Sequence, residues 1–348
     1  MGDVFSGVIG HAPVLGMLRS ELARPAQAYL FVGPAGVGKA TVARRFAAAL
    51  LADDPSVRAR VVAGNHPDLI LVEPEGRASV TVDQARQAVA QASLAPMVAD
   101  RKVFLFEEGG MMNEEAANAL LKTLEEPTPS TIFVIVVDSG DELPPTVASR
   151  CRAVVFGRVP DDEVVAGLAA TGLDREQAER SARVAGGRPG LALTMATRPE
   201  VAEFRRVWLS VPERLSGAPG DAYLLAEEVE QATRPLLAAV TEAGATSADE
   251  LTGKRGEDRA ERAVRRATGA LHVSGLEILA GFYRDVAAAQ LGAPVLNADI
   301  PATSLTTLSA VDAVAAAARV LDTIEALEAN QRPVLAFANL FADLGAPH

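Results

Sequence analysis

Short apolar runs alternate with segments of helical periodicity over the first 160 positions of the chain. Such runs are typical of strands buried on both faces of a parallel sheet. The four runs are residues 28–32, 69–72, 103–106 and 131–137. Between them, residues 82–92 and 114–125 place their apolar side chains on one face of a helix. This order predicts an α/β domain in which helices cover both faces of a parallel sheet.

Beyond residue 158 the apolar positions follow a helical period. Residues 161–170 and 175–185 fit two short helices, and the pattern from residue 198 onward is helical with breaks at glycine and proline. We therefore expect three parts. They are an α/β core over residues 1–157, a helical lid over 158–197 and an all-helical domain over 198–348.

Length, charge and cysteine content limit the possible classes. A chain of 348 residues exceeds what one hydrophobic core usually supports. No apolar run approaches the roughly 18 residues that span a bilayer, and the first residues lack a signal-peptide pattern, so we expect a cytoplasmic protein. The only cysteine, Cys151, excludes an internal disulfide and a cysteine-rich zinc site, and we expect it to be a buried apolar residue. A net charge of −12 argues against binding nucleic acid by overall electrostatics.

A candidate phosphate-binding loop follows the first predicted strand. Its spacing is G-x-x-x-x-G-K, and a helix comes directly after it. In this context backbone N–H groups and the helix N-terminus surround phosphates, and the lysine reaches their oxygens. The next position normally gives Mg²⁺ a hydroxyl but is Ala40 here, and Thr41 lies about 100° further round the helix. The ATP-binding candidates in this segment are Gly33, Gly36, Gly38, Lys39 and Thr41.

Polar side chains end two of the predicted strands. Glu107 and Glu108 follow residues 103–106, and Asp138 follows residues 131–137. Ligands of α/β sheets bind at the carboxyl ends of the strands, so these carboxylates are further candidates. The alternative is that two buried strands simply end in solvated polar residues, as in many α/β sheets.

Two motifs carry a family resemblance. Residues 118–127 read NALLKTLEEP, and Ser149, Arg150 and Cys151 follow at a fixed distance. Together they resemble the AAA+ ATPase core of the bacterial replicative clamp loader and of its eukaryotic relative, replication factor C. The resemblance extends from about residue 5 to residue 193.

The positions at which this chain departs from the family pattern indicate which branch of the family it resembles. Its ATP-hydrolysing members have a hydroxyl after the loop lysine, an Asp-Glu pair at the strand end, four zinc-binding cysteines and a sensor arginine. In this chain those places hold Ala40, a Glu-Glu pair, no cysteine, and Gly190 with Arg188 offset nearby. These losses resemble the delta-prime branch, whose members assemble with the ATPases but are usually not ATPases. The missing zinc module leaves open what stabilises residues 52–64.

The resemblance also implies residue roles. In this family the arginine of the S-R-C motif acts in trans on the γ-phosphate of a neighbour's ATP, which makes Arg150 the catalytic candidate. Glu107 and Glu108 lie where magnesium coordination and water activation occur in active members, and Asp138 lies at the first sensor. The alternative for Arg150 is a surface or intramolecular ion pair.

The resemblance implies an accessory subunit of the DNA polymerase III clamp loader. Its partners would be delta and gamma/tau subunits in a hetero-pentamer, and through that complex the sliding clamp and primer-template DNA, with no membrane. Its loop would take ATP with Mg²⁺ if intact, without zinc. The main alternative is a self-sufficient, gamma/tau-like ATPase in which Thr41 and Glu107 manage the metal. A third is a module that only assembles and whose Arg150 contributes nothing.

Overall fold

The computed structural model describes residues 3–74, 79–245, 254–297, 300–306, 308–329 and 331–346. The chain divides into two compact units. The α/β unit contains residues 1–172, 187–190 and 251–259, and the helical unit contains residues 173–186, 191–250 and 260–348. The predicted lid, with its boundaries at 158 and 197, stays a prediction.

A five-stranded parallel sheet forms the centre of the α/β unit, in the order β2-β3-β4-β1-β5. The strands are β1 (Ala28–Val32), β2 (Leu69–Leu71), β3 (Lys102–Phe106), β4 (Thr131–Val137) and β5 (Arg152–Val155). The α/β prediction is confirmed, and the four apolar runs form β1 to β4. The sequence analysis did not predict β5, an edge strand that buries only Val154, although residues 153–156 form a short apolar run.

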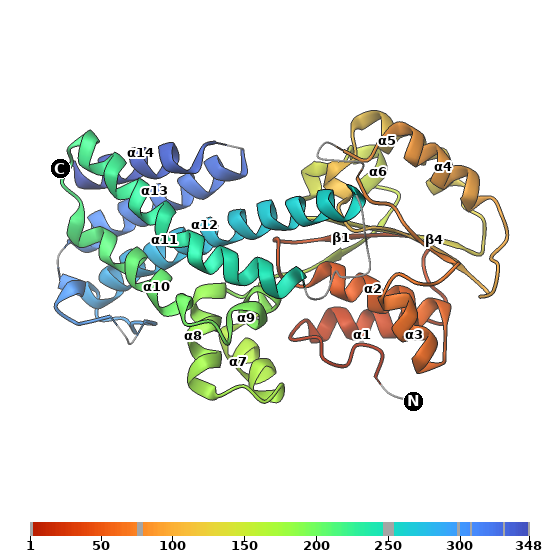
Figure 1. The fold of residues 1–348 in the computed structure, drawn as a ribbon, viewed down its shortest axis with the longest axis horizontal. Coiled ribbons are helices and arrows are strands. Elements are labelled where there is room, and N and C mark those ends of the chain that lie inside the picture. The colour runs from red at the N-terminus through yellow and green to blue at the C-terminus, as the bar shows by residue number, and fades with distance from the viewer. Residues whose placement is uncertain are drawn as a thin grey trace. The chain divides into compact units, whose positions relative to one another are not determined.

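Helices cover both faces of this sheet (Figure 1). One face carries α1 (Ala12–Glu21), α2 (Lys39–Leu51) and α3 (Pro55–Val62), and the other carries α4 (Val82–Ala92), α5 (Glu114–Glu125) and α6 (Pro145–Ala148). The unit also contains α7 (Asp161–Ala170) and two 3₁₀ turns, η1 (Gly109–Met111) and η2 (Gly140–Glu142). Alternate strand residues enter the two cores, as where Leu105 packs on one side and Phe104 on the other.

Helix α3 accounts for the stability of residues 52–64. The carboxylate of Asp54 caps α3 by accepting hydrogen bonds from the backbone N–H groups of Ser56 and Val57, at 2.8 and 3.1 Å. Val61 is fully buried in the core beneath α2. The guanidinium of Arg44 donates to the carbonyl of Val62 at 3.0 Å, which ties the end of α3 to α2. A cap, a buried valine and a hydrogen bond from α2 therefore hold this segment.

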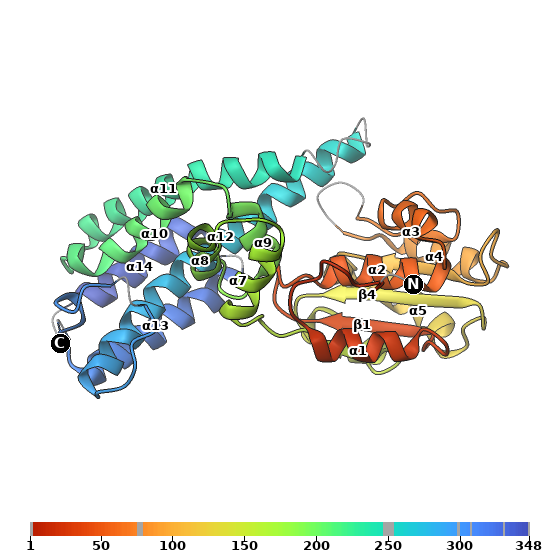
Figure 2. The same ribbon diagram turned by 90° about the horizontal axis from the view of Figure 1, so that it is seen from below.

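Packed helices build the helical unit, as predicted for the C-terminal part of the chain. The helices that lie wholly or mostly in this unit are α8 (Arg175–Ala185), α9 (Pro189–Met195), α10 (Glu200–Ser210), η3 (Val211–Arg214), α11 (Pro219–Ala245), α12 (Lys254–Gln290), η4 (Ser304–Thr306), α13 (Ala310–Glu328) and α14 (Pro333–Gly345). Helix α14 packs along α11 and α13, and α10 packs on α11 (Figures 1 and 2). The buried Trp208 meets Phe337 edge-on, with ring centroids 5.3 Å apart.

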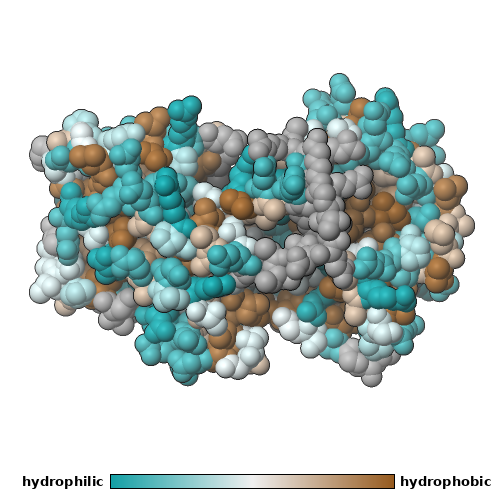
Figure 3. All heavy atoms as spheres, in the orientation of Figure 1, coloured by the Kyte–Doolittle hydropathy of each residue, from teal (hydrophilic) through white to brown (hydrophobic). Residues whose placement is uncertain are grey.

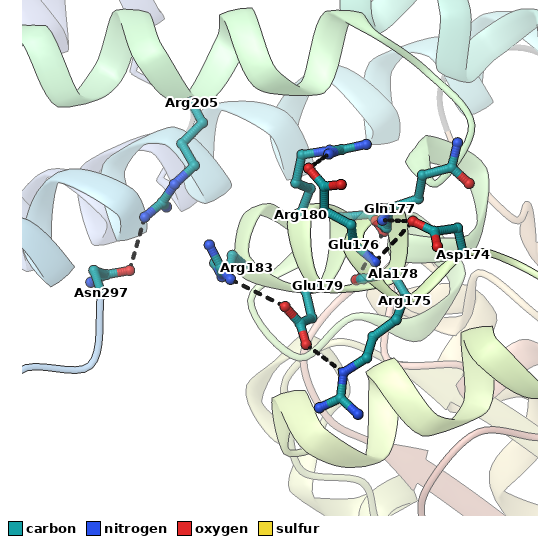
Figure 4. Close-up of polar contacts among 11 residues, drawn as sticks. Asp174, Arg175, Glu176, Gln177, Ala178, Glu179, Arg180, Arg183, Arg205 and Asn297 are labelled. Carbon is teal, nitrogen blue, oxygen red and sulfur yellow. Dashed lines mark hydrogen bonds and ion pairs between the residues drawn. The ribbon is translucent and has the colours of Figure 1, made fainter. Parts of the chain in front are cut away.

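Polar contacts fix the local geometry of α8 and of the loop after α12 (Figure 4). Asp174 caps α8 through the first backbone N–H groups, and Glu179 lies between Arg175 and Arg183, 2.9 and 3.6 Å from their nitrogens. Pairs of this spacing stabilise a helix by a few tenths of a kcal/mol each, about 0.3–0.5. Elsewhere in the unit, Arg205 of α10 donates to the side chain of Asn297 at 2.9 Å.

The face drawn in Figure 3 is largely polar, with separate apolar patches among the hydrophilic residues. Within the residues that the structure describes, none of the helices combines the length and the apolar character needed to cross a membrane.

Candidate functional site

The candidate phosphate-binding loop joins β1 to α2 in the expected strand, loop and helix context. Gly33 has φ +154°, and a Cβ atom there would lie 2.1 Å from the carbonyl oxygen of Phe156, so only glycine fits beside the end of β5. Gly36 and Gly38 also have positive φ, +79° and +106°, and Gly38 precedes the first turn of α2. The backbone therefore has the turn geometry that exposes N–H groups at a helix N-terminus.

Lys39 has partners from its own chain for all its ammonium hydrogens. Its Nζ lies 2.5 and 2.8 Å from the carbonyl oxygens of Gly33 and Pro34 and 2.7 Å from Oδ1 of Asp138. An ammonium has three N–H groups, so these contacts use every one. The Lys39 side chain is only 5% exposed, so the lysine end of the ion pair with Asp138 is buried.

Glu142 lies beside Asp138. The backbone N–H of Asp138 donates to Oε2 of Glu142 at 3.0 Å. That carboxylate folds back over the turn after β3, because a Cβ atom on Gly110 would lie 2.0 Å from the same Oε2. Burial raises the pKa of the Glu142 carboxyl, and the negative charge of Asp138 adds to the increase.

Arg44 occupies both carboxylate oxygens of Glu107. Its Nε donates to one oxygen, and one terminal nitrogen donates to the other at 2.7 Å. The third nitrogen donates to the carbonyl of Val62. The two side chains are 18% and 16% exposed, and the hydrogen bond to Glu107 raises the pKa of Arg44. Arg44 therefore neutralises the charge of Glu107 through a bidentate ion pair.

These residues do not fit a magnesium-bound nucleotide as they are arranged. Ala40 has no side-chain oxygen for a metal, and Thr41 is exposed on α2. The carboxylate of Glu107 already binds a cation, and Glu108 is half-buried at the start of η1. Across the described part of the chain, no group of three His, Cys, Asp or Glu side chains could hold a metal ion.

Arg188 and Gly190 both lie beside the phosphate-binding loop, and Arg188 covers it with its side chain. Arg188 is 3% exposed, and its Cδ lies 3.2 Å from the position that a Cβ atom on Gly36 would take. A Cβ atom on Gly190 would lie 3.7 Å from the Gly36 carbonyl oxygen. Both residues thus border the loop, and the arginine stem covers Gly36.

Arg150 lies between α6 and β5 and pairs within the chain. Its Nε donates to Oε1 of Glu125 at 2.8 Å, a terminal nitrogen also contacts that oxygen, and the other donates to the carbonyl of Thr146 at 2.6 Å. The Arg150 side chain is 34% exposed and that of Glu125 is 48% exposed. The guanidinium is thus at the surface but held in one orientation.

The loop and Arg150 lie at opposite ends of the sheet. The register pairs Tyr29 of β1 with Arg152 of β5, and the loop begins at Gly33. Four residues of strand span about 13 Å, and Arg150 precedes Arg152. The structure thus brings Gly33, Lys39 and Asp138 together, with Glu107 on the neighbouring strand, but it does not bring Arg150 to this group.

Comparison with known proteins shows which family the part of the chain that carries this site resembles. Residues 11–160 match the family described as DNA polymerase III, delta subunit. DNA polymerase III subunit delta' of Pseudomonas aeruginosa is 40% identical over 139 residues, 37% of this chain and 42% of that protein. The delta' subunit of Bacillus subtilis is 32% identical over 39% of this chain and 44% of its own. Residues 11–160 of this chain are therefore similar to clamp-loader delta' subunits.

Other relatives match the same part of the chain. The tau subunit of Bacillus subtilis is 31% identical over 46% of this chain and 30% of its own. The chain therefore spans less than half the length of these curated relatives. Among solved structures, a DNA polymerase III gamma subunit-related protein of Thermotoga maritima aligns over 95% of this chain and 98% of its own, with 15% identity and a TM-score of 0.41.

Cys151 follows Arg150 and packs against the core beneath α5 and α6. Burial raises the pKa of its thiol to about 11, so the thiol stays protonated at neutral pH. This agrees with the predicted apolar role, but the side chain is half-buried rather than fully buried.

The sequence interpretation missed Arg44 and the partner of Arg150. Arg44 stands with Arg45 in an otherwise Ala-rich helix, and this pair of charges was the available signal. Glu125 lies within the NALLKTLEEP motif, yet nothing in its position marks it as the residue that orients Arg150.

Proposed function

We propose that this chain is the delta-prime-type subunit of a bacterial DNA polymerase III clamp loader. In this role it assembles in the cytoplasm with delta and gamma/tau subunits in a hetero-pentamer and presents Arg150 to the ATP of a neighbour. The sliding clamp and primer-template DNA are reached through the complex, in keeping with the net charge of −12. The similarity of residues 11–160 to delta' subunits supports this role.

The position of Arg150 is the observation that carries the proposal. It lies about 13 Å or more along the sheet from its own loop, beyond the reach of an arginine side chain, so any phosphate it touches belongs to another molecule. At 34% exposure it remains accessible to a partner. A guanidinium suits this task because it is always charged and binds phosphate oxygens through two donors at once.

Glu125 positions Arg150 without trapping it. An exposed ion pair contributes about 0–1 kcal/mol, so moving the guanidinium to a phosphate costs little. An arginine finger contributes a factor of about 10³ to 10⁵ in rate to other nucleotide hydrolases, which is several kcal/mol. The gain at a neighbour's active site therefore exceeds the cost of leaving Glu125.

Helix α13 offers a surface for assembly. Val311, Val314 and Leu321 share one side of this helix and are 78%, 59% and 52% exposed. Large apolar side chains at such spacing on a surface helix are typical of a protein interface. We assign this stripe to contacts with partner subunits.

The gamma/tau-like alternative has less support. It requires Thr41 and Glu107 to manage Mg²⁺, but Thr41 is exposed and Glu107 is paired with Arg44. The assembly-only alternative requires Arg150 to have no effect beyond its contact with Glu125.

Reconstituted clamp loader carrying Arg150→Ala tests the three roles. We expect DNA-stimulated ATP turnover at the adjoining site to fall by about 10³ and clamp loading to fall with it. The matched control is Arg152→Ala, since Arg152 is two residues away, is exposed and pairs with Glu21. Equal activity of the two variants would favour the assembly-only role. ATP turnover by the isolated chain that Lys39→Ala abolishes would favour the gamma/tau-like role.

A further inference from the structure

Asp138 takes the position on Lys39 that a phosphate oxygen would need. The other two acceptors of the ammonium are carbonyls of the loop backbone, fixed by β1 and by the glycine turn. The Asp138 side chain is 53% exposed and is the only one of the three that can swing away. A phosphate that binds Lys39 must therefore displace this carboxylate.

Negative charge surrounds the ammonium. Besides Asp138, the carboxylate of Glu142 accepts the Asp138 backbone N–H at 3.0 Å. Lys39 itself is 5% exposed, whereas solvent reaches the Asp138 side of the pair, which is 53% exposed. An incoming triphosphate would meet two carboxylates and a single ammonium that is already paired.

The metal side of the loop is closed in the same way. Arg44 uses two nitrogens on Glu107 and the third on the Val62 carbonyl. All three guanidinium nitrogens have acceptors from the chain, and moving the side chain away from Glu107 would also break its hydrogen bond to the end of α3. The positive charge of the Arg44 guanidinium is thus held beside the Glu107 carboxylate.

We propose that Asp138 is an internal anion that competes with nucleotide phosphates for Lys39, and that Arg44 takes the place of the metal at Glu107. The loop is then held by its own residues as a structural element. This inference concerns the chain's own loop and does not depend on Arg150, so its failure leaves the proposed function in trans untouched.

Nucleotide binding to the full-length Asp138→Asn variant tests the proposal. The amide keeps the shape of the side chain but removes the charge, and we expect ATP to bind at least about tenfold more tightly than to the parent chain. Asp141→Asn is the control, because it removes the same charge three residues away from an exposed side chain in η2. Titration calorimetry with ATP, in Mg²⁺ and in EDTA, gives the dissociation constants.

Two further measurements locate the effect. Adding Lys39→Met to Asp138→Asn should abolish the gain if ATP binds this loop. The gain should be the same in Mg²⁺ and in EDTA, since Arg44 still covers Glu107. Asp138→Asn binding no tighter than Asp141→Asn, or more weakly than the parent chain, would overturn the role of Asp138. A gain that requires Mg²⁺ would overturn the role of Arg44. Far-UV circular dichroism confirms that each variant is folded.

Discussion

Replacing Arg44 by methionine should destabilise the α/β unit strongly for a single polar substitution. The change keeps the apolar stem but leaves the Glu107 carboxylate, 16% exposed, without its two hydrogen bonds, and removes the link to Val62. Hydrogen bonds to charged groups contribute about 1.5–3 kcal/mol, and loss of one member of a fully buried pair costs about 3–5. Since this pair is partly exposed, we expect a loss of about 2–3 kcal/mol in the free energy of unfolding.

A double-mutant cycle with Glu107→Gln isolates the pair. Removing both charges leaves no unpaired carboxylate, so the double variant should be more stable than the sum of the single changes predicts, by about 1–2 kcal/mol. Urea unfolding followed by far-UV circular dichroism measures each term, and 2–3 kcal/mol corresponds to about 1 M in midpoint.

Arg45→Met is the control for this cycle. Arg45 is adjacent in α2 and donates to the carbonyl of Ser6 at the surface, so its loss should cost less than about 1 kcal/mol. A coupling energy near zero between Arg44 and Glu107 would refute the internal ion pair, and with it the argument that Arg44 excludes a metal from Glu107.

Three further substitutions test the packing within the two units. Gly275→Ala would put a Cβ atom 2.0 Å from the Trp208 ring, so we expect about 1–3 kcal/mol of destabilisation of the helical unit by tryptophan fluorescence. Gly269→Ala, in the same helix with open space around it, should instead stabilise by about 0.5–1 kcal/mol, and equal effects would contradict the contact. Asp68→Asn should cost about 2 kcal/mol at pH 7, because Asp68 is buried and accepts the backbone N–H groups of residues 97–99. Burial alone would raise the pKa of this carboxyl, but those hydrogen bonds lower it. Its contribution is therefore present above the unfolded pKa of about 4 and is lost as the pH falls further, so the difference between parent and variant should shrink in acid; a pH-independent difference would contradict this.

The sequence determined the central part of the fold because the signals there are local. Four strands are apolar on both faces, and each appears as a continuous run, as in β4 (Thr131–Val137). The glycines of the loop could be predicted for the same reason, since Gly33, Gly36 and Gly38 each have a positive φ angle, which favours glycine. The helical character of the C-terminal part follows from periodicity alone.

Tertiary structure decided the chemistry of the site. Arg44 and Glu107 are 63 positions apart, and Arg150 and Glu125 are 25 apart, so no local pattern reveals either pair. The edge strand β5 was likewise not predicted: its apolar run is short, and the structure buries only Val154 of the strand. A charge in the sequence states only that a carboxylate or guanidinium exists. Whether it serves a ligand or another side chain depends on which neighbours the fold brings within hydrogen-bonding distance.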